Sequence, residues 1–119
     1  MKIVTHPGPA HRDEFLACCF LLANHPGIRV IERREPTPDD LDNGETFVVD
    51  VGGKHEPELN NFDHHQLPRE HEPVCALTLV LRYIGVEKMA RDVFPWLTLT
   101  EILDSKGPFV AAQHLGCSR

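Results

Sequence analysis

The chain has 119 residues and a mass of 13.4 kDa, the usual size of one domain, so we expect residues 1–119 to form a single domain. Its net charge of −6 argues against a long basic groove for duplex DNA and against polybasic attachment to acidic membranes. Eight histidines beside eighteen acidic residues are instead a large store of metal ligands.

The cysteines indicate neither a zinc motif nor a disulfide framework. Cys18 and Cys19 are adjacent, whereas Cys75 and Cys117 are isolated in the sequence. No apolar run reaches the roughly 18 residues of a membrane-spanning helix, and the N-terminus turns polar after two apolar residues. We therefore expect a protein of the reducing cytoplasm.

The first half of the chain alternates between predicted strands and a helix. Apolar runs predict strands over residues 3–4, 28–31 and 46–51, and helical spacing predicts a helix over 13–23. An acidic connector covers 36–44. This order is typical of a parallel sheet with right-handed crossovers, so the predicted fold class is α/β, with a parallel sheet and flanking helices.

The second half is predicted to be mainly helical. Residues 54–73 are too polar for a core and are expected to form a loop or a strand edge. Apolar spacing then predicts helices over 74–84, 87–96 and 98–104, each closed by Gly or Pro. No repeat or linker divides the chain, and residues 106–119 form a short tail.

Two residues of the sheet's predicted carboxyl edge indicate a ligand site. His6 ends the first strand, and Asp50 follows the apolar residues of the third, so the two side chains should be neighbours. Gly52 and Gly53 allow a sharp turn behind Asp50, which aims its carboxylate into the crevice at the strand ends. A cation is the usual partner of such a carboxylate, and mixed histidine and aspartate donors suit manganese, iron or zinc.

The adjacent histidines of the polar segment have two interpretations. In one, His64 and His65 are loop residues on opposite sides of an extended chain. In the other, His64 ligates a metal, His65 points at a substrate oxygen, and Asp63 orients an imidazole from behind. Four further histidines lack comparable context and are treated as surface or loop residues: His25, His55, His71 and His114.

Three motifs in order resemble the DHH phosphoesterase superfamily, and most closely its melanocyte-proliferating-gene exonuclease family. They are Thr5-His6 with His11-Arg12-Asp13-Glu14, then Val48-Val49-Asp50-Val51-Gly52-Gly53, then Phe62-Asp63-His64-His65-Gln66. The resemblance implies a parallel α/β domain with two divalent cations, usually Mn²⁺. It also implies that activated water cleaves phosphodiester or phosphoanhydride bonds.

The resemblance also assigns a role to each matching position. His6 and His11 would bind the first ion, and Asp50 would bridge the two ions. The second ion would be bound by Asp13, His64 and Asp104, with Asp92 as the substitute for Asp104. Asp50 and His65 would be the catalytic residues, His65 facing the phosphate. Lys54 or Arg69 would supply further positive charge near it.

The superfamily usually continues into a second domain that closes over the metals, and this chain stops at Arg119. The resemblance thus implies a phosphodiesterase or exonuclease acting on a nucleotide, an oligonucleotide or a small phosphate ester. A non-catalytic module that binds a nucleotide or a protein, or a purely structural domain, are the alternatives. A homodimer could supply the missing wall, with large apolar residues of the segment 80–97 in its interface.

Overall fold

A computed structural model describes residues 1–68 and 70–117. The described part contains one sheet of five strands in the order β2-β1-β3-β5-β4. The strands are β1 (Lys2–Thr5), β2 (Val30–Arg33), β3 (Thr46–Val49), β4 (His55–Glu56) and β5 (Asn61–Phe62). The first four in spatial order run parallel, and only β4 pairs antiparallel, with β5. The predicted α/β fold class is confirmed.

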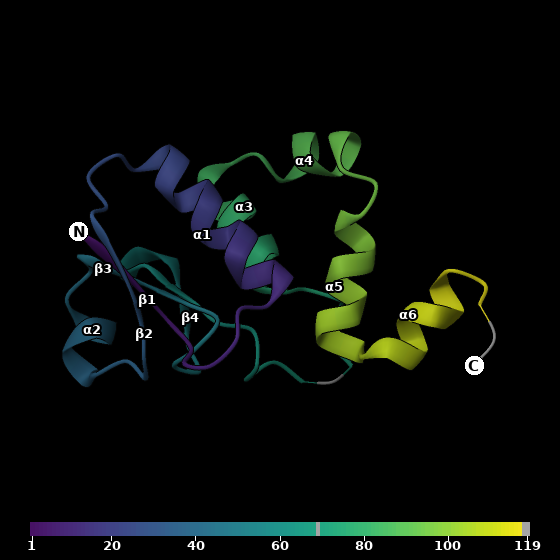
Figure 1. Cartoon of the computed structure of the whole chain (residues 1–119), viewed down its shortest axis with the longest axis horizontal. Helices are drawn as coiled ribbons and strands as arrows, with labels where there is room; N and C mark the ends of the chain where they lie inside the picture. Colours follow the sequence, from purple (N-terminus) through teal and green to yellow (C-terminus); the bar gives the residue numbers. More distant parts are fainter. Residues whose placement is uncertain (69, 118–119) are drawn as a thin grey trace.

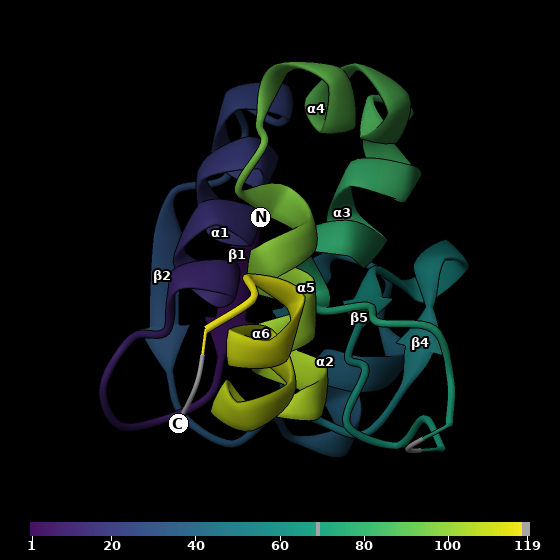
Figure 2. The same cartoon turned by 90° about the vertical axis from the view of Figure 1, so that its right-hand side faces the viewer.

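Helices cover both faces of this sheet (Figure 1). On one face lie α1 (Arg12–Asn24) and α3 (Ala76–Ile84), and on the other lies the short α2 (Pro38–Asp42). Beyond them follow α4 (Glu87–Val93), α5 (Leu97–Lys106) and α6 (Pro108–His114). Figure 2 shows α5 and α6 in front of the sheet, and Figure 1 shows that they lie at the opposite end of the molecule from the N-terminus.

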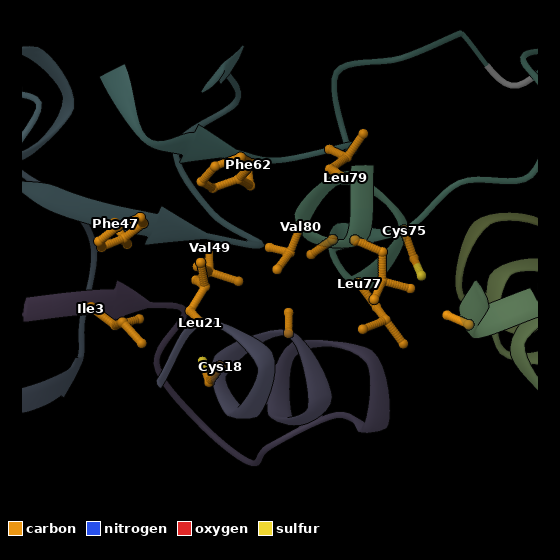
Figure 3. Packing of buried hydrophobic residues seen from close by; sticks show 14 of the residues in the cluster. Ile3, Cys18, Leu21, Phe47, Val49, Phe62, Cys75, Leu77, Leu79 and Val80 are labelled. Atoms are coloured by element: carbon orange, nitrogen blue, oxygen red, sulfur yellow. The ribbon is translucent and has the colours of Figure 1, made fainter. Parts of the chain in front are cut away.

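The central strands are buried on both faces. Ile3, Phe47 and Val49 face α1 and α3 and belong to the main apolar cluster (Figure 3). Leu21 of α1 and Leu77 and Val80 of α3 pack against them, and all are fully buried. Val4 and Val48, which alternate with these residues, are equally buried on the other face. This double burial explains why the strands are continuous apolar runs rather than alternating ones.

The structure differs from the sequence prediction at one strand start and in two segments without a predicted helix. The second strand begins at Val30, because the amide of Ile28 donates to the carbonyl of His25 and closes the turn after α1. The predicted connector contains α2, which begins with a capping box in which Thr37 and Asp40 exchange hydrogen bonds. The short tail contains α6, a helix over residues 108–114 that the sequence analysis did not predict.

The polar segment 54–73 also differs from its prediction. It forms β4, β5 and a single 3₁₀ turn at Pro57–Leu59, so the expected strand edge is present. Its residues 60–64 are nevertheless part of the interior, and Asn61, Asp63 and His64 among them are buried polar residues. Asn61, for example, donates its side-chain amide to the carbonyl of Leu41 at 2.8 Å. The expectation that this segment is too polar for the core was therefore wrong for residues 60–64, whereas its other described residues are exposed or half-buried.

Most of the large apolar residues that the sequence analysis singled out in the segment 80–97 pack inside the monomer. Val80 and Leu97 are buried, and Ile84, Phe94 and Trp96 are partly buried against the core. Tyr83 and Val93 stay exposed. The fourth helix ends at Val93 instead of residue 96, because Pro95 disfavours a helical conformation for the preceding residue, and Phe94 is extended.

Candidate metal centre

Three parallel strands deliver chemistry-bearing side chains to one edge of the sheet. His6 follows β1, Asp50 follows β3, and Asp63 and His64 follow β5. At this edge His6 Nε2 lies 3.6 Å from Asp50 Oδ2, and His64 Nε2 lies 3.1 Å from Asp50 Oδ1. Asp50 therefore occupies the centre of the edge, between two imidazoles from neighbouring strands.

Asp50 adopts a backbone conformation that few non-glycine residues take. Its φ is 60°, in the left-handed region, and its amide donates to the carbonyl of Phe62 at 2.8 Å. Such a conformation costs roughly 1–3 kcal/mol, which the surrounding structure must supply. The turn thus begins at Asp50 itself and not at the glycines behind it. Gly52 (φ 94°) is still required, because a Cβ there would lie 3.0 Å from Leu41 Cδ2.

The first group of donors consists of His6, His11 and Asp50, whose ligand atoms lie within 4.8 Å of one another. His6 Nδ1 lies 2.8 Å from the carbonyl of Pro7, which can only accept, so Nδ1 donates and Nε2 is the ring nitrogen turned towards the other ligands. Nε2 is buried without a hydrogen bond and faces carboxylate oxygens of Asp50 and Glu14, the latter at 2.9 Å. A ring nitrogen that faces two carboxylates in this way is an arrangement suited to binding a cation.

The second group consists of Asp13, Asp50, His64 and Asp104, again within 4.8 Å. Asp13 stands in the first turn of α1, where Oδ2 accepts from the amide of Ala76 at 3.3 Å, while the buried Oδ1 has no hydrogen bond. Asp104 comes from α5, and its Oδ2 lies 2.8 Å from His64 Nε2. The group therefore joins two strand ends to two helices.

The electrostatics of the second group reflect three crowded carboxylates. Burial, followed by the charges of Asp50 and Asp104, raises the pKa of Asp13 to about 7. Burial alone lowers the pKa of His64, but its interactions with Asp104 and Asp50 outweigh that effect and raise it to about 10. In the metal-free protein a proton on His64 thus occupies the space between two carboxylates. A divalent cation in this space would compensate the same charges.

His65 differs from its neighbour, because its side chain is 60% exposed. Its Nδ1 lies 2.6 Å from Asp63 Oδ1, and this hydrogen bond raises the pKa of His65. Asp63 also accepts from the amide of Gly53 at 2.8 Å, so its carboxylate is held in place. Burial by itself would raise the pKa of Asp63. The hydrogen bonds from His65 and Gly53 outweigh burial, so the pKa is lowered and the carboxylate stays charged. Asp63 thus orients the imidazole of His65 towards solvent beside Asp50.

Two hollows open at this cluster, and Asp104 lines both of them. The larger, of about 390 Å³, lies between α1 and α5 and is also lined by Arg12, Leu99 and Leu103. The Arg12 guanidinium is held 5.0 Å from the centroid of the Trp96 ring. The smaller, of about 140 Å³, lies beside His64, His65 and Lys106. The site is therefore accessible to a ligand from two sides.

The structure brings together His6, His11, Asp13, Asp50, His64 and Asp104, with His65 alongside. Asp92 is exposed on α4 and belongs to none of the donor groups formed by residues 1–68 and 70–117. Lys54 is exposed and pairs with Glu56 at 3.6 Å. Arg69 lies outside the described residues.

Sequence reasoning missed Glu14 and Arg33, which contact the first group without belonging to it. Glu14 was quoted only as part of a motif. Its position three residues after His11 is that of a capping-box glutamate at a helix start, and this signal could have identified it. Arg33 had no comparable signal, because its contacts join segments far apart in the sequence.

The fold and the site together define an α/β protein whose sheet edge carries three overlapping sets of metal-type ligands that all contain Asp50. Besides the two groups described above, the ligand atoms of Asp50, Asp63, His64 and His65 also lie within 4.8 Å of one another. Comparison of the sequence with protein families identifies the family: residues 2–77 match the MYG1 exonuclease family, described as "Uncharacterised protein family (UPF0160)". The chain belongs to this family. No solved structure matches the chain.

Individual relatives support the assignment over different lengths. The chain is 39% identical over 67 residues to the MYG1 exonuclease of Rattus norvegicus, covering 55% of this chain and 17% of the rat protein. It is 33% identical to a MYG1 protein of Schizosaccharomyces pombe over 110 residues, 85% of this chain and 32% of the yeast protein. The MYG1 protein of Chlamydia trachomatis is 32% identical over 102 residues, 83% of this chain and 34% of that protein. The chain thus spans no more than about a third of these relatives' length.

No helix in residues 1–68 and 70–117 combines the length and the apolarity that crossing a bilayer would need.

Proposed function

We propose that this chain carries the metal centre of a phosphoesterase of the DHH superfamily, which hydrolyses phosphodiester bonds of a nucleotide or nucleic-acid substrate. One observation carries the proposal: Asp50 belongs to both donor groups, one with His6 and His11 and one with Asp13, His64 and Asp104. A carboxylate shared by two ligand sets is the arrangement that a pair of divalent ions requires. The exonuclease names of the mammalian relatives support the same class of reaction.

The donor set also fits the kind of ion proposed. His6 and His11 would hold one ion, Asp13, His64 and Asp104 the other, and Asp50 would hold both. Mixed imidazole and carboxylate donors suit Mn²⁺, Fe²⁺ or Zn²⁺ better than Ca²⁺ or Mg²⁺, and we propose Mn²⁺. When bound, two such ions supply Lewis-acid activation of water and charge stabilisation at phosphorus.

The chain's own residues position the substrate. His65 stands beside Asp50, held by Asp63, and its raised pKa lets it donate a charged hydrogen bond to a phosphate oxygen. Asp63 fixes the ring so that the donating nitrogen faces outward, which lowers the cost of ordering it in the complex. Asp50 and Asp13 stay buried, which keeps bulk water away from their carboxylates.

The two hollows on either side of Asp104 give the two substituents of a phosphodiester separate places. The acidic net charge of −6 is compatible with such a substrate, because two divalent ions add four positive charges at the site itself. The substrate class is a nucleotide, an oligonucleotide or a small phosphate ester.

We further propose that a second copy of the chain narrows access to the site, because an exposed centre orients a substrate poorly. Part of the segment 80–97 would form the homodimer interface, where Tyr83 and Val93 are exposed. We place the protein in the cytoplasm, in keeping with four free cysteines.

Metal content and hydrolysis test the proposal together. The purified chain is dialysed against Mn²⁺, its bound metal is counted, and hydrolysis of bis(p-nitrophenyl) phosphate and of a short oligonucleotide is followed. We expect two ions per chain and hydrolysis that a chelator abolishes. His65→Ala should retain both ions and lose hydrolysis, whereas Asp92→Asn should change neither. Two bound ions without hydrolysis of either substrate would instead favour a non-catalytic binding module.

A further inference from the structure

A buried carboxylate next to the metal centre belongs to neither donor group. The side chain of Glu14 is 1% exposed, and it lies at the third position of α1, directly after the ligand Asp13. A carboxylate buried to this extent is costly unless charged and hydrogen-bonding partners surround it. The hydrogen-bond and ion-pair partners of Glu14 therefore indicate its role.

The two oxygens of Glu14 reach both histidines of the first group. Oε1 accepts from the backbone amide of His11 at 3.0 Å. Oε2 accepts from the hydroxyl of Thr5, the residue before His6, at 2.6 Å, and also lies 2.9 Å from Nε2 of His6, the nitrogen that would face the metal, so Glu14 positions His6 through Thr5. The same hydroxyl lies 2.8 Å from the carbonyl of Val49, the residue before Asp50. One carboxylate thus ties together the chain positions of all three donors of this group.

Arg33 completes the arrangement from the far side of the loop. It ends the edge strand β2, and its Nη2 donates to Glu14 Oε1 at 2.9 Å. Its Nε and Nη2 also donate to the carbonyl of Gly8, at 3.1 and 2.8 Å. Gly8 lies in the loop that joins His6 to His11, and its φ of 85° gives the loop its turn. The planar guanidinium of Arg33 therefore both holds the loop between His6 and His11 and compensates the charge of Glu14.

We propose that Glu14 and Arg33 form a positioning pair that sets the geometry of His6 and His11, and thereby the affinity of the first metal site. The inference rests on the two-metal function proposed above. It predicts an asymmetry, because the second site has its own supports: the amide of Ala76 holds Asp13, and Asp104 comes from α5. Loss of the pair should weaken one site and spare the other.

The test measures the number of bound Mn²⁺ ions and their affinities by isothermal titration calorimetry and electron paramagnetic resonance. The proteins compared are wild type, Glu14→Gln, Arg33→Ala and Arg33→Lys. We expect wild type to bind two ions. Each variant should bind one ion with unchanged affinity and the other at least about tenfold more weakly, as expected when an outer partner of a metal ligand is lost. Arg33→Lys keeps the charge but not the planar fork, so it should lose affinity as well.

Arg34→Ala is the matched control. Arg34 is 35% exposed against 36% for Arg33, and it is also ion-paired, but with Glu32 and Asp40, away from both histidines. It should bind two ions like wild type. Far-UV circular dichroism verifies the fold of each variant, and Arg33→Lys, the mildest change, carries the test if the others do not fold.

Two outcomes would overturn the positioning pair while leaving the metal centre intact. One is that folded Arg33→Lys and Arg33→Ala bind both ions with wild-type affinity. The other is that they lose both ions equally, since this would contradict the asymmetry. A wild-type protein that binds no divalent ion would instead overturn the proposed function and the inference with it, so the two failures are distinguishable.

Discussion

Asp50→Asn removes the charge that both ligand sets share and changes little else. Asn is close in shape to Asp and is among the residues that tolerate the left-handed conformation present at φ 60°. It also relieves repulsion, since the charge of Asp50 contributes to the raised pKa of Asp13. The fold should therefore survive, and the loss should fall on metal binding.

The expected effect follows from linkage between binding and folding. At a metal concentration of 100 times the dissociation constant, each site stabilises the native state by about 2.7 kcal/mol. A chain of 119 residues has an unfolding entropy of roughly 250 cal/mol/K, so each site should raise the melting temperature by about 10 °C. Wild type should thus gain roughly 20 °C from Mn²⁺, and Asp50→Asn should gain almost nothing.

The assay is thermal unfolding with Mn²⁺ and with chelator, together with a count of bound metal. Taking the difference between the two conditions for each protein removes any change in metal-free stability. Asp92→Asn, an exposed position on α4, should behave like wild type. An Asp50→Asn protein that binds two ions and gains as much stability as wild type would refute the shared-ligand argument.

The remaining predictions concern pH, the second site and assembly. Metal must displace a proton from His64 (pKa about 10) and, below about pH 7, one from Asp13, so affinity should rise with pH. Calorimetry should show that the Mn²⁺ affinity rises by up to about tenfold between pH 7 and 8, and more steeply with pH below pH 7. An affinity that does not change with pH would contradict the assigned ligands. Asp104→Asn should lose the second ion and retain the first, which metal analysis at increasing Mn²⁺ would check; loss of both ions or of neither would be inconsistent with the grouping. Sedimentation should show a dimer for wild type and a monomer for Val93→Asp, whereas a monomeric wild type with full activity would argue against the second wall.

Much of the site could be predicted because its residues stand at the ends of elements that the sequence specifies locally. The apolar runs before His6 and Asp50 identify β1 and β3, and parallel pairing alone brings their carboxyl ends to one edge. The start of α1 follows the same edge, which explains why Asp13 lies near them. These inferences need only periodicity, strand direction and chain connectivity.

Other features depend on contacts between distant segments. The short strands β4 and β5 are polar in sequence, and Asn61 is accommodated only because Leu41 of α2 offers it a carbonyl. The contribution of Asp104 depends on how α5 packs against α1, which no local pattern encodes, so Asp92 stayed open as a substitute until the helices were placed. The helix α6 follows Gly107 in a segment whose composition gave no clear signal.

The sequence by itself determined the α/β class, the edge of the sheet that carries the site, and the residue types gathered there, because strand ends and helix starts are encoded by neighbouring residues. The family resemblance implied how those residues divide around Asp50, but only the tertiary structure placed the ligand atoms of each group within 4.8 Å of one another. It also placed Glu14 and Arg33 against the group of His6, His11 and Asp50, because their hydrogen bonds join residues 5, 8, 11, 14 and 33 across separate elements. Charge and burial at such a site depend on distances in space, and these are set by packing of the whole chain.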